Sequence, residues 1–252
     1  MNKQKQRHSI LIVASFFFAL FLNINTSQAQ GGLSLGQTRV IFNAKENSTK
    51  VSINNQSDQV YLLNSRVLPT PDLNTEINEK MPFLITPPLF RLEKESRNSM
   101  LISKNDTSKL PLDRESVFYL SFLAIPAVKK HDENEFDEGI TSTQVSFGIR
   151  TIIKLFYRPT GLSMPAKEAP AKLTFDKQGA QLIVNNPTPY YVTLAQLTLN
   201  HHEIDVREQG PMIAPFSAQT YSIKEMDKAS TIEWSVINDF GGMSEVYRWS
   251  GK

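Results

Sequence analysis

Short runs of β-branched and aromatic residues recur along this chain about 8–12 residues apart, separated by turn-forming residues. The clearest run is 145–159 (VSFGIRTIIKLFYRP), in which Val145, Phe147 and Ile149 alternate with small or polar residues. Period-two alternation places the apolar set on one face of a strand, and Pro159 ends the run because proline cannot donate to a ladder. This spacing favours β-sandwiches.

The runs fall into two blocks. The first block predicts strands at 33–42, 49–54, 60–68, 99–103, 117–125 and 145–159, while Pro87-Pro88 prevents 83–92 from being one central strand. A proline-rich polar stretch follows, and the second block predicts strands at 172–175, 181–184, 190–199, 203–206, 219–223, 230–238 and 245–249. The sequence therefore predicts an all-β protein with a first domain over 30–158, a linker over 159–166 and a second domain over 167–252.

The N-terminus has the layout of a secretory signal peptide. Lys3, Lys5 and Arg7 precede an apolar stretch over 10–22, and small and polar residues follow as far as Ala29. The alternative is a membrane anchor, but an apolar core of about 13 residues is short for a span. We expect cleavage near Ala29, which defines 1–29 as the signal peptide and makes the mature chain an exported protein.

Composition excludes several classes of function. The 252-residue chain contains no cysteine, which removes disulfides, zinc–thiolate centres and a cysteine nucleophile. A net charge of +2 provides no large basic field for nucleic acid.

The enzyme signals are weak. Gly32 to Gly36 matches the pattern G-x-S-x-G around Ser34, but a strand is predicted after it where a nucleophile elbow needs a helix. His201 and His202 are adjacent, so in a strand they point to opposite faces and make poor joint ligands. No nucleotide-binding motif is present. We expect no catalysis, cofactor or metal.

Two cations lie among apolar residues in predicted strands. Arg39 precedes Val40 and Ile41, and Lys154 lies near the end of the run 145–159. The plain interpretations are an edge-strand arginine and a lysine that reaches toward solvent. Together, however, the two side chains can hold a carboxylate by charge-assisted hydrogen bonds. The polar loop 129–142 leads directly into the Lys154 strand, and a loop of that length is often functional.

Six segments resemble the PapD-like periplasmic chaperones of the chaperone–usher pilus pathway. They are 38–42 (TRVIF), 86–92 (TPPLFRL), 113–120 (DRESVFYL), 153–159 (IKLFYRP), 186–193 (NPTPYYVT) and 237–242 (INDFGG), in the order expected.

The resemblance implies two immunoglobulin-like β-sandwich domains joined at an angle. It also implies that Arg39 and Lys154 anchor the C-terminal carboxylate of a pilus subunit. Val145, Phe147 and Ile149 are similar to the residues that donate a strand to the subunit. Glu115, Arg158 and Asp239 match the family's interdomain ionic network. The implied partners are fimbrial subunits and an outer-membrane usher, and the implied location is the periplasm.

Several points remain open from the sequence. In a regular strand Lys154 has the opposite parity to Val145, Phe147 and Ile149, so either a bulge intervenes or the carboxylate approaches from the cleft side, between the two domains. The family has a short-loop branch and a long-loop branch. The chain has a long polar loop but no cysteines, so its branch stays open, and we favour the short-loop branch. Self-association of the free protein through the donor strand is open. A fimbrial adhesin or pilin-like module is the alternative function.

Overall fold

The computed structural model describes residues 32–74, 80–127, 146–223 and 231–250. In these ranges the chain forms two β-sandwiches, each with its own hydrophobic core. The predicted signal peptide, the polar loop 129–142 and Val145 lie outside the described residues. None of the helices in the described ranges is long and apolar enough to cross a membrane.

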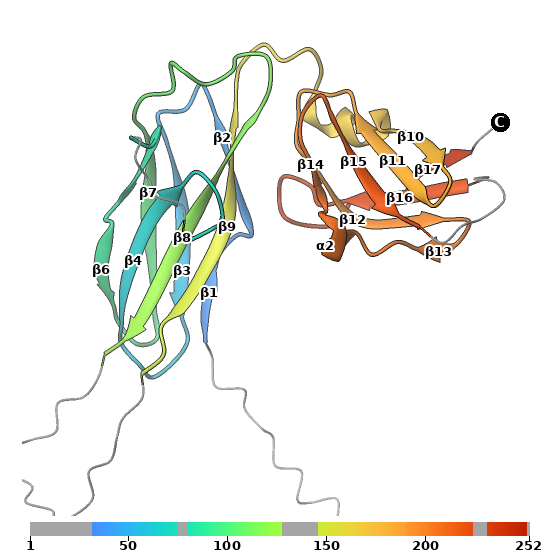
Figure 1. The fold of residues 1–252 in the computed structure, drawn as a ribbon. Coiled ribbons are helices and arrows are strands. Elements are labelled where there is room, and N and C mark those ends of the chain that lie inside the picture. Colours follow the sequence, from blue (N-terminus) through green and yellow to red (C-terminus); the bar gives the residue numbers. More distant parts are fainter. Residues whose placement is uncertain (1–31, 75–79, 128–145, 224–230, 251–252) are drawn as a thin grey trace, which may run out of the picture. The chain divides into compact units, whose positions relative to one another are not determined.

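The first sandwich packs a four-stranded sheet against a five-stranded sheet (Figure 1). The smaller sheet has the order β1–β3–β7–β5, with β1 (Leu33–Leu35), β3 (Ser48–Asn55), β7 (Ser96–Lys104) and β5 (Phe83–Thr86). The larger sheet has the order β2–β9–β8–β4–β6, with β2 (Arg39–Asn43), β9 (Ile149–Arg158), β8 (Ser116–Pro126), β4 (Tyr61–Leu68) and β6 (Leu89–Leu92). In this sheet β2 and β9 run parallel, and the other neighbours are antiparallel.

The second sandwich is smaller. One sheet contains β10 (Thr174–Gln178), β11 (Gln181–Asn186) and β15 (Ser217–Ser222), in that order. The other has the order β13–β12–β16–β17, with β13 (His202–Glu203), β12 (Val192–Leu199), β16 (Thr231–Val236) and β17 (Tyr247–Ser250), and β14 (Met212–Ile213) also pairs with β12. A 3-10 helix, η1 (Ala166–Lys172), and a short helix, α2 (Val206–Gln209), complete the domain.

The cores form where the alternating apolar side chains of facing sheets meet. In the first domain Phe42 and Phe83 come from opposite sheets, and their ring centroids lie 5.0 Å apart. In the second domain Tyr221 is fully buried and Trp234 is nearly so. The Trp234 indole N–H donates to the carbonyl of Pro170 at 3.0 Å, which satisfies its polar group inside the core. The prediction of two β-sandwiches is confirmed.

The predicted strand 33–42 is wrong as a single element. The chain leaves the smaller sheet after Leu35 and enters the larger sheet at Arg39, so β1 pairs with β3 whereas β2 pairs with β9. At Gly36 the backbone N–H donates to the Ser52 carbonyl at 2.9 Å, and a Cβ at that position would collide with the Ser52 hydroxyl. Glycine thus permits the close approach at the point where the chain changes sheets.

Two other predicted strands need correction. The strand that carries Lys154 begins at Ile149, because the neighbouring β8 ends at Pro126, which cannot donate to a longer ladder. Residues 146–148 are therefore not in a strand. The predicted strand 203–206 is split between β13 and the helix α2. Asp205 caps α2 by accepting hydrogen bonds from the backbone N–H groups of Arg207 and Glu208.

Candidate functional site

Arg39 and Lys154 lie directly opposite each other on neighbouring strands. The parallel register of β2 and β9 pairs Arg39 with Lys154. Their chain neighbours Val40 and Leu155 are buried in the first core, so the two cations project from the other face of the larger sheet. The sheet thus brings together two residues that are far apart in the sequence.

The strand that carries Lys154 is regular over its whole described length. The pairing of β9 with β8 proceeds without a register shift from Ile149 opposite Ala124 to Tyr157 opposite Ser116. Lys154 therefore points to the opposite face from Ile149, and no bulge intervenes between them. Of the two alternatives left open by the sequence, this pairing excludes a bulge between Ile149 and Lys154.

The Arg39 guanidinium is held on two sides. Its Nη1 donates to the carbonyl oxygen of Ile237 at 3.0 Å, and its central carbon lies 5.7 Å from the centroid of the Phe156 ring, which is within cation–π range. Its Nε is buried and has no hydrogen-bond partner among the described residues. Burial lowers the pKa of Arg39, and the negative charges of Asp239 and Glu115 partly offset this effect.

Lys154 has no neutralising partner in the described part of the chain, where no ion pair within 4.0 Å and no hydrogen bond involve its ammonium group. Burial lowers the pKa of Lys154, and the positive charge of Arg39 lowers it further. Two adjacent, partly desolvated cations with no bridging carboxylate among the described residues form a site that an anion stabilises.

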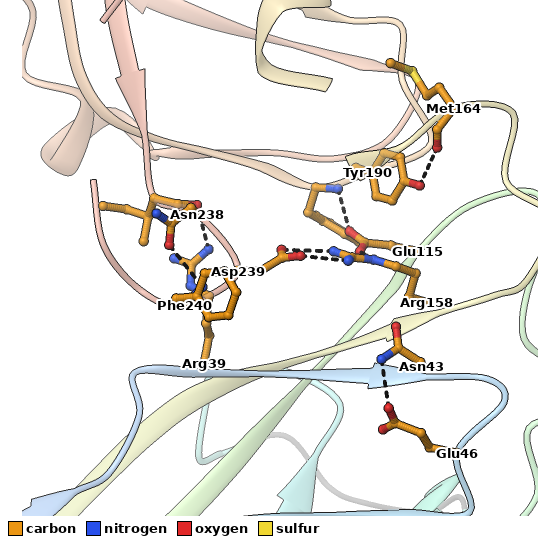
Figure 2. A network of polar contacts seen from close by, with 12 residues as sticks. Arg39, Asn43, Glu46, Glu115, Arg158, Met164, Tyr190, Asn238, Asp239 and Phe240 are labelled. Carbon is orange, nitrogen blue, oxygen red and sulfur yellow. Dashed lines mark hydrogen bonds and ion pairs between the residues drawn. The ribbon is translucent and has the colours of Figure 1, made fainter. Parts of the chain in front are cut away.

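A second cluster of charges lies around Arg158, the last residue of β9 and the partner of Asn43 at the end of β2 (Figure 2). The Arg158 Nε donates to Glu115 at 2.8 Å, while its Nη1 and Nη2 donate to the two carboxylate oxygens of Asp239 at 2.7 and 3.0 Å. The backbone N–H of Tyr191 donates to the other oxygen of Glu115 at 2.9 Å. The Arg158 guanidinium also lies 5.1 Å from the ring centroid of Tyr190. The structure therefore brings Glu115, Arg158 and Asp239 into one network.

The environment of these charges is uneven. The Glu115 side chain is only 2% exposed, whereas Asp239 is 44% exposed. Burial raises the pKa of Glu115, although the charge of Arg158 and the two hydrogen bonds oppose that change. Burial alone would lower the pKa of Arg158, but its hydrogen bonds to Asp239 and Glu115 and their charges outweigh burial and raise it.

The predicted donor residues lie at the far end of β9 from Lys154. Phe147 is 77% exposed in the segment just before the strand, and Ile149 at its start is 53% exposed. Val145 lies outside the described residues. At about 3.3 Å per residue, Ile149 and Lys154 are about 16 Å apart along the strand.

The weak enzyme motifs of the sequence acquire no supporting geometry. Ser34 lies within β1, and the next element is another strand, β2, so the strand–turn–helix of a nucleophile elbow does not form. His201 lies in a turn and His202 on the short strand β13, and both are exposed. Within the described ranges, no group of three or more potential ligands is suited to a metal ion.

Sequence reasoning missed one contact of the predicted site, the Ile237 carbonyl that accepts a hydrogen bond from Arg39. A main-chain carbonyl carries no residue-type signal, so only the fold can identify it. It also missed an exposed apolar patch formed by Leu62, Leu89 and Ile125 on the larger sheet, where Leu62 pairs directly with Ile125. Exposed apolar residues at alternate positions of predicted strands were the available signal for this patch.

Two family models together match most of the chain. Residues 32–163 match the model described as "Pili and flagellar-assembly chaperone, PapD N-terminal domain". Residues 168–247 match the model described as "Pili assembly chaperone PapD, C-terminal domain".

Individual relatives agree with these matches. The chain is 36% identical to the probable fimbrial chaperone LpfB of Escherichia coli O157:H7 over 239 residues, which cover 93% of this chain and 96% of LpfB. It is 31% identical to the chaperone protein HifB of Haemophilus influenzae over 246 residues, which cover 97% of this chain and 98% of HifB.

Solved structures show the same fold. The E. coli chaperone DraB superimposes with a TM-score of 0.71 at 30% identity, covering 87% of this chain and 98% of DraB. A structure of the Salmonella enterica SafA pilin in complex with the SafB chaperone matches with a TM-score of 0.71 at 28% identity, covering 89% of this chain and 98% of the matched chain. The chain therefore belongs to the PapD family of pilus-assembly chaperones.

Proposed function

We propose that this chain is a periplasmic chaperone that caps a pilus subunit by donating a β-strand, and then delivers the subunit to an outer-membrane usher. The role requires no chemical step by the chaperone. Export by the predicted signal peptide supports a periplasmic location. The observation that carries the proposal is the pair of Arg39 and Lys154 at the end of an open strand edge, with no ion-pair partner for either cation in the part of the chain that the structure describes.

The open edge is the first half of β9. On one side β9 pairs with β8 from Ile149 to Tyr157, whereas on the other side β2 pairs only with residues Lys154 to Arg158. No described strand pairs with residues 149–153 on that second side. An incoming strand can therefore add to the sheet there by main-chain hydrogen bonds.

The register also predicts the direction of the bound strand. Because β2 runs parallel to β9 and begins at Arg39, an added strand parallel to β9 ends where Arg39 and Lys154 lie. Its C-terminal carboxylate then meets the two cations. A charge-assisted hydrogen bond of this kind contributes about 1.5–3 kcal/mol, and the anchored end sets the register of the whole added strand.

The other half of the capping interaction is apolar. A subunit that lacks its last strand exposes a groove that promotes aggregation. Phe147 and Ile149 are exposed in the free chaperone and can enter such a groove. Full burial of each side chain contributes about 1.5–3 kcal/mol. The same edge can pair with a second copy of the chain when no subunit is bound.

Delivery to an usher needs a surface that the subunit leaves free. The apolar patch of Leu62, Leu89 and Ile125 is exposed and suited to this purpose. Leu62 and Leu89 lie on β4 and β6, the two strands farthest from β2, and Ile125 lies at the end of β8 that is distant from Lys154. Exposed apolar patches of this kind mark protein–protein interaction sites. We assign it to the usher contact.

The anchor is tested by co-expression with a pilin subunit in the bacterial periplasm and recovery through a tag on the chaperone. Arg39→Ala and Lys154→Ala should each abolish co-purification of the subunit, while circular dichroism shows a folded chaperone. Arg66→Ala and Lys50→Ala remove exposed cations on β4 and β3 and serve as matched controls. Normal recovery of the subunit with the double variant of Arg39 and Lys154 would refute the anchor.

A further inference from the structure

The segment 237–242 that contacts Arg39 is a compact loop held by its own hydrogen bonds. The Asn238 side-chain oxygen accepts from the backbone N–H groups of Phe240 and Gly242 at 3.0 and 3.1 Å. The Asn238 backbone N–H donates to the Gly242 carbonyl at 2.8 Å, and the Gly241 N–H donates to the Asn238 carbonyl at 3.0 Å. These hydrogen bonds give the loop one defined conformation after β16 ends at Val236.

The loop contacts two arginines of the first domain, Arg39 and Arg158. Asp239 receives two hydrogen bonds from Arg158, and the carbonyl of Ile237, two residues earlier, receives one from Arg39 (Figure 2). The hydrogen bond from Arg39 to Ile237 therefore depends on the position of the loop, and the ion pair of Asp239 with Arg158 is one of the interactions that hold the loop in place.

A steric contact also seats the loop beside Arg39. Gly241 has a φ of +84°, and a Cβ at this position would collide with the hydroxyl of Thr38, the residue directly before Arg39. Glycine is thus required at Gly241 both by its backbone conformation and by the approach to Thr38. A side chain here would push the loop away from β2.

These contacts bear on how Arg39 meets a carboxylate. A free arginine side chain samples many rotamers, and restricting them costs affinity when a ligand binds. Here Nη1 is held by Ile237 and the guanidinium face by Phe156, while the buried Nε has no partner among the described residues. The guanidinium is therefore already oriented before a client binds.

We propose that the loop 237–242 of the second domain is a positioning part of the carboxylate anchor: it holds Arg39 through the Ile237 carbonyl, in the orientation that accepts the C-terminus of a client. This inference rests on the proposed function of Arg39. If the loop has this role, client capture by the first domain depends on a loop that supplies no positive charge to bind the client's carboxylate.

The test substitutes Gly241→Ala in the full chain and measures subunit capture in the co-expression assay, followed by dissociation rates of the purified complexes. We expect capture affinity to fall about tenfold, the usual effect of losing a hydrogen bond to a charged group. Gly179→Ala is the matched control, because Gly179 also has a positive φ, of +57°, but has no neighbouring atom within 4 Å of the place that a Cβ would occupy. It should leave capture unchanged.

A double variant separates steric displacement from backbone strain. Thr38→Ala removes the hydroxyl that an alanine at position 241 would strike, so the combined variant Thr38→Ala/Gly241→Ala should recover most of the lost affinity. The orientation of Arg39 is read without a client from its Nε–H resonance in ¹⁵N-labelled protein, assigned by its absence in Arg39→Lys. We expect Gly241→Ala to increase the mobility of this group and Gly179→Ala not to change it.

The outcomes distinguish the two proposals. If Arg39→Ala abolishes capture while Gly241→Ala behaves like Gly179→Ala in capture and in the Arg39 resonance, the positioning role is refuted and the anchor stands. If Arg39→Ala captures the subunit normally, the anchor itself fails.

Discussion

Removal of Arg158 tests the energetics of the charged network most directly. Arg158→Ala deletes the cation between Glu115 and Asp239, and the two carboxylates differ sharply in burial, at 2% and 44% exposed. Asp239 becomes a solvated surface carboxylate at little cost. Glu115 becomes a buried charge without its cation. Breaking a buried ion pair in this way costs about 3–5 kcal/mol of stability. Both Glu115 and Arg158 belong to the first sandwich, so the loss should appear in the unfolding of that domain.

The predicted loss also depends on pH in a defined direction. Burial already raises the pKa of Glu115, and loss of Arg158 removes the charge that opposes this rise. A carboxyl group whose pKa is higher in the folded state than in the unfolded state stabilises the fold when the pH is below its unfolded-state pKa. That contribution is lost as the pH rises through its folded-state pKa. The deficit of Arg158→Ala relative to the unmodified protein should therefore be largest at neutral pH and shrink toward about pH 4–5, near the ordinary pKa of a glutamate.

The assay is urea denaturation followed by circular dichroism at neutral and mildly acidic pH. Asp239→Asn is the matched variant, because it removes the exposed partner and should cost below about 1 kcal/mol. Adding Glu115→Gln to Arg158→Ala should recover part of the stability by removing the buried charge. This explanation would be refuted if Arg158→Ala lowered the free energy of unfolding by less than about 1 kcal/mol at neutral pH, or if that loss did not shrink on acidification.

Three further predictions concern partners. Phe147→Asp should weaken subunit capture because it places a charge in an apolar groove, whereas Leu112→Asp, at a site equally exposed at 76%, should not; equal binding by the two variants in the co-expression assay argues against strand donation. Capture should decline as the pH rises through the lowered pKa of Lys154, because only the charged ammonium binds the carboxylate, and Lys154→Arg should flatten that dependence in surface-binding measurements at neutral to alkaline pH. Leu62→Glu should leave subunit capture intact and reduce fibre assembly with the usher in cells; undiminished assembly contradicts the assignment of the patch.

Local signals in the sequence were sufficient for most of the strands but not for the helices. Alternation of β-branched and aromatic residues predicted most of the strands, and Pro87-Pro88 correctly separated β5 from β6. The helix α2 was missed although its signal was present, since Asp205 followed by Glu208 has the spacing of a capping box. The short length of that helix left no apolar period to confirm it.

The pairing of strands was decided by the tertiary structure. Gly36 marks a possible break in the predicted strand, but the sequence does not indicate which sheet each half joins, because that choice depends on which distant strands, β3 and β9, offer hydrogen-bonding edges. The regular pairing of β9 with β8 determines that Lys154 and Ile149 face opposite sides of one strand, which excludes a bulge between these two residues.

The sequence by itself determined the class of protein and named Arg39 and Lys154 as cations in apolar strands, because side-chain type and period are local properties. Only the tertiary structure decided that they are neighbours at the end of an open edge, and that a backbone carbonyl at Ile237 holds one of them. The physical reason is that main-chain hydrogen bonds between distant segments depend on position and carry no signature in residue identity.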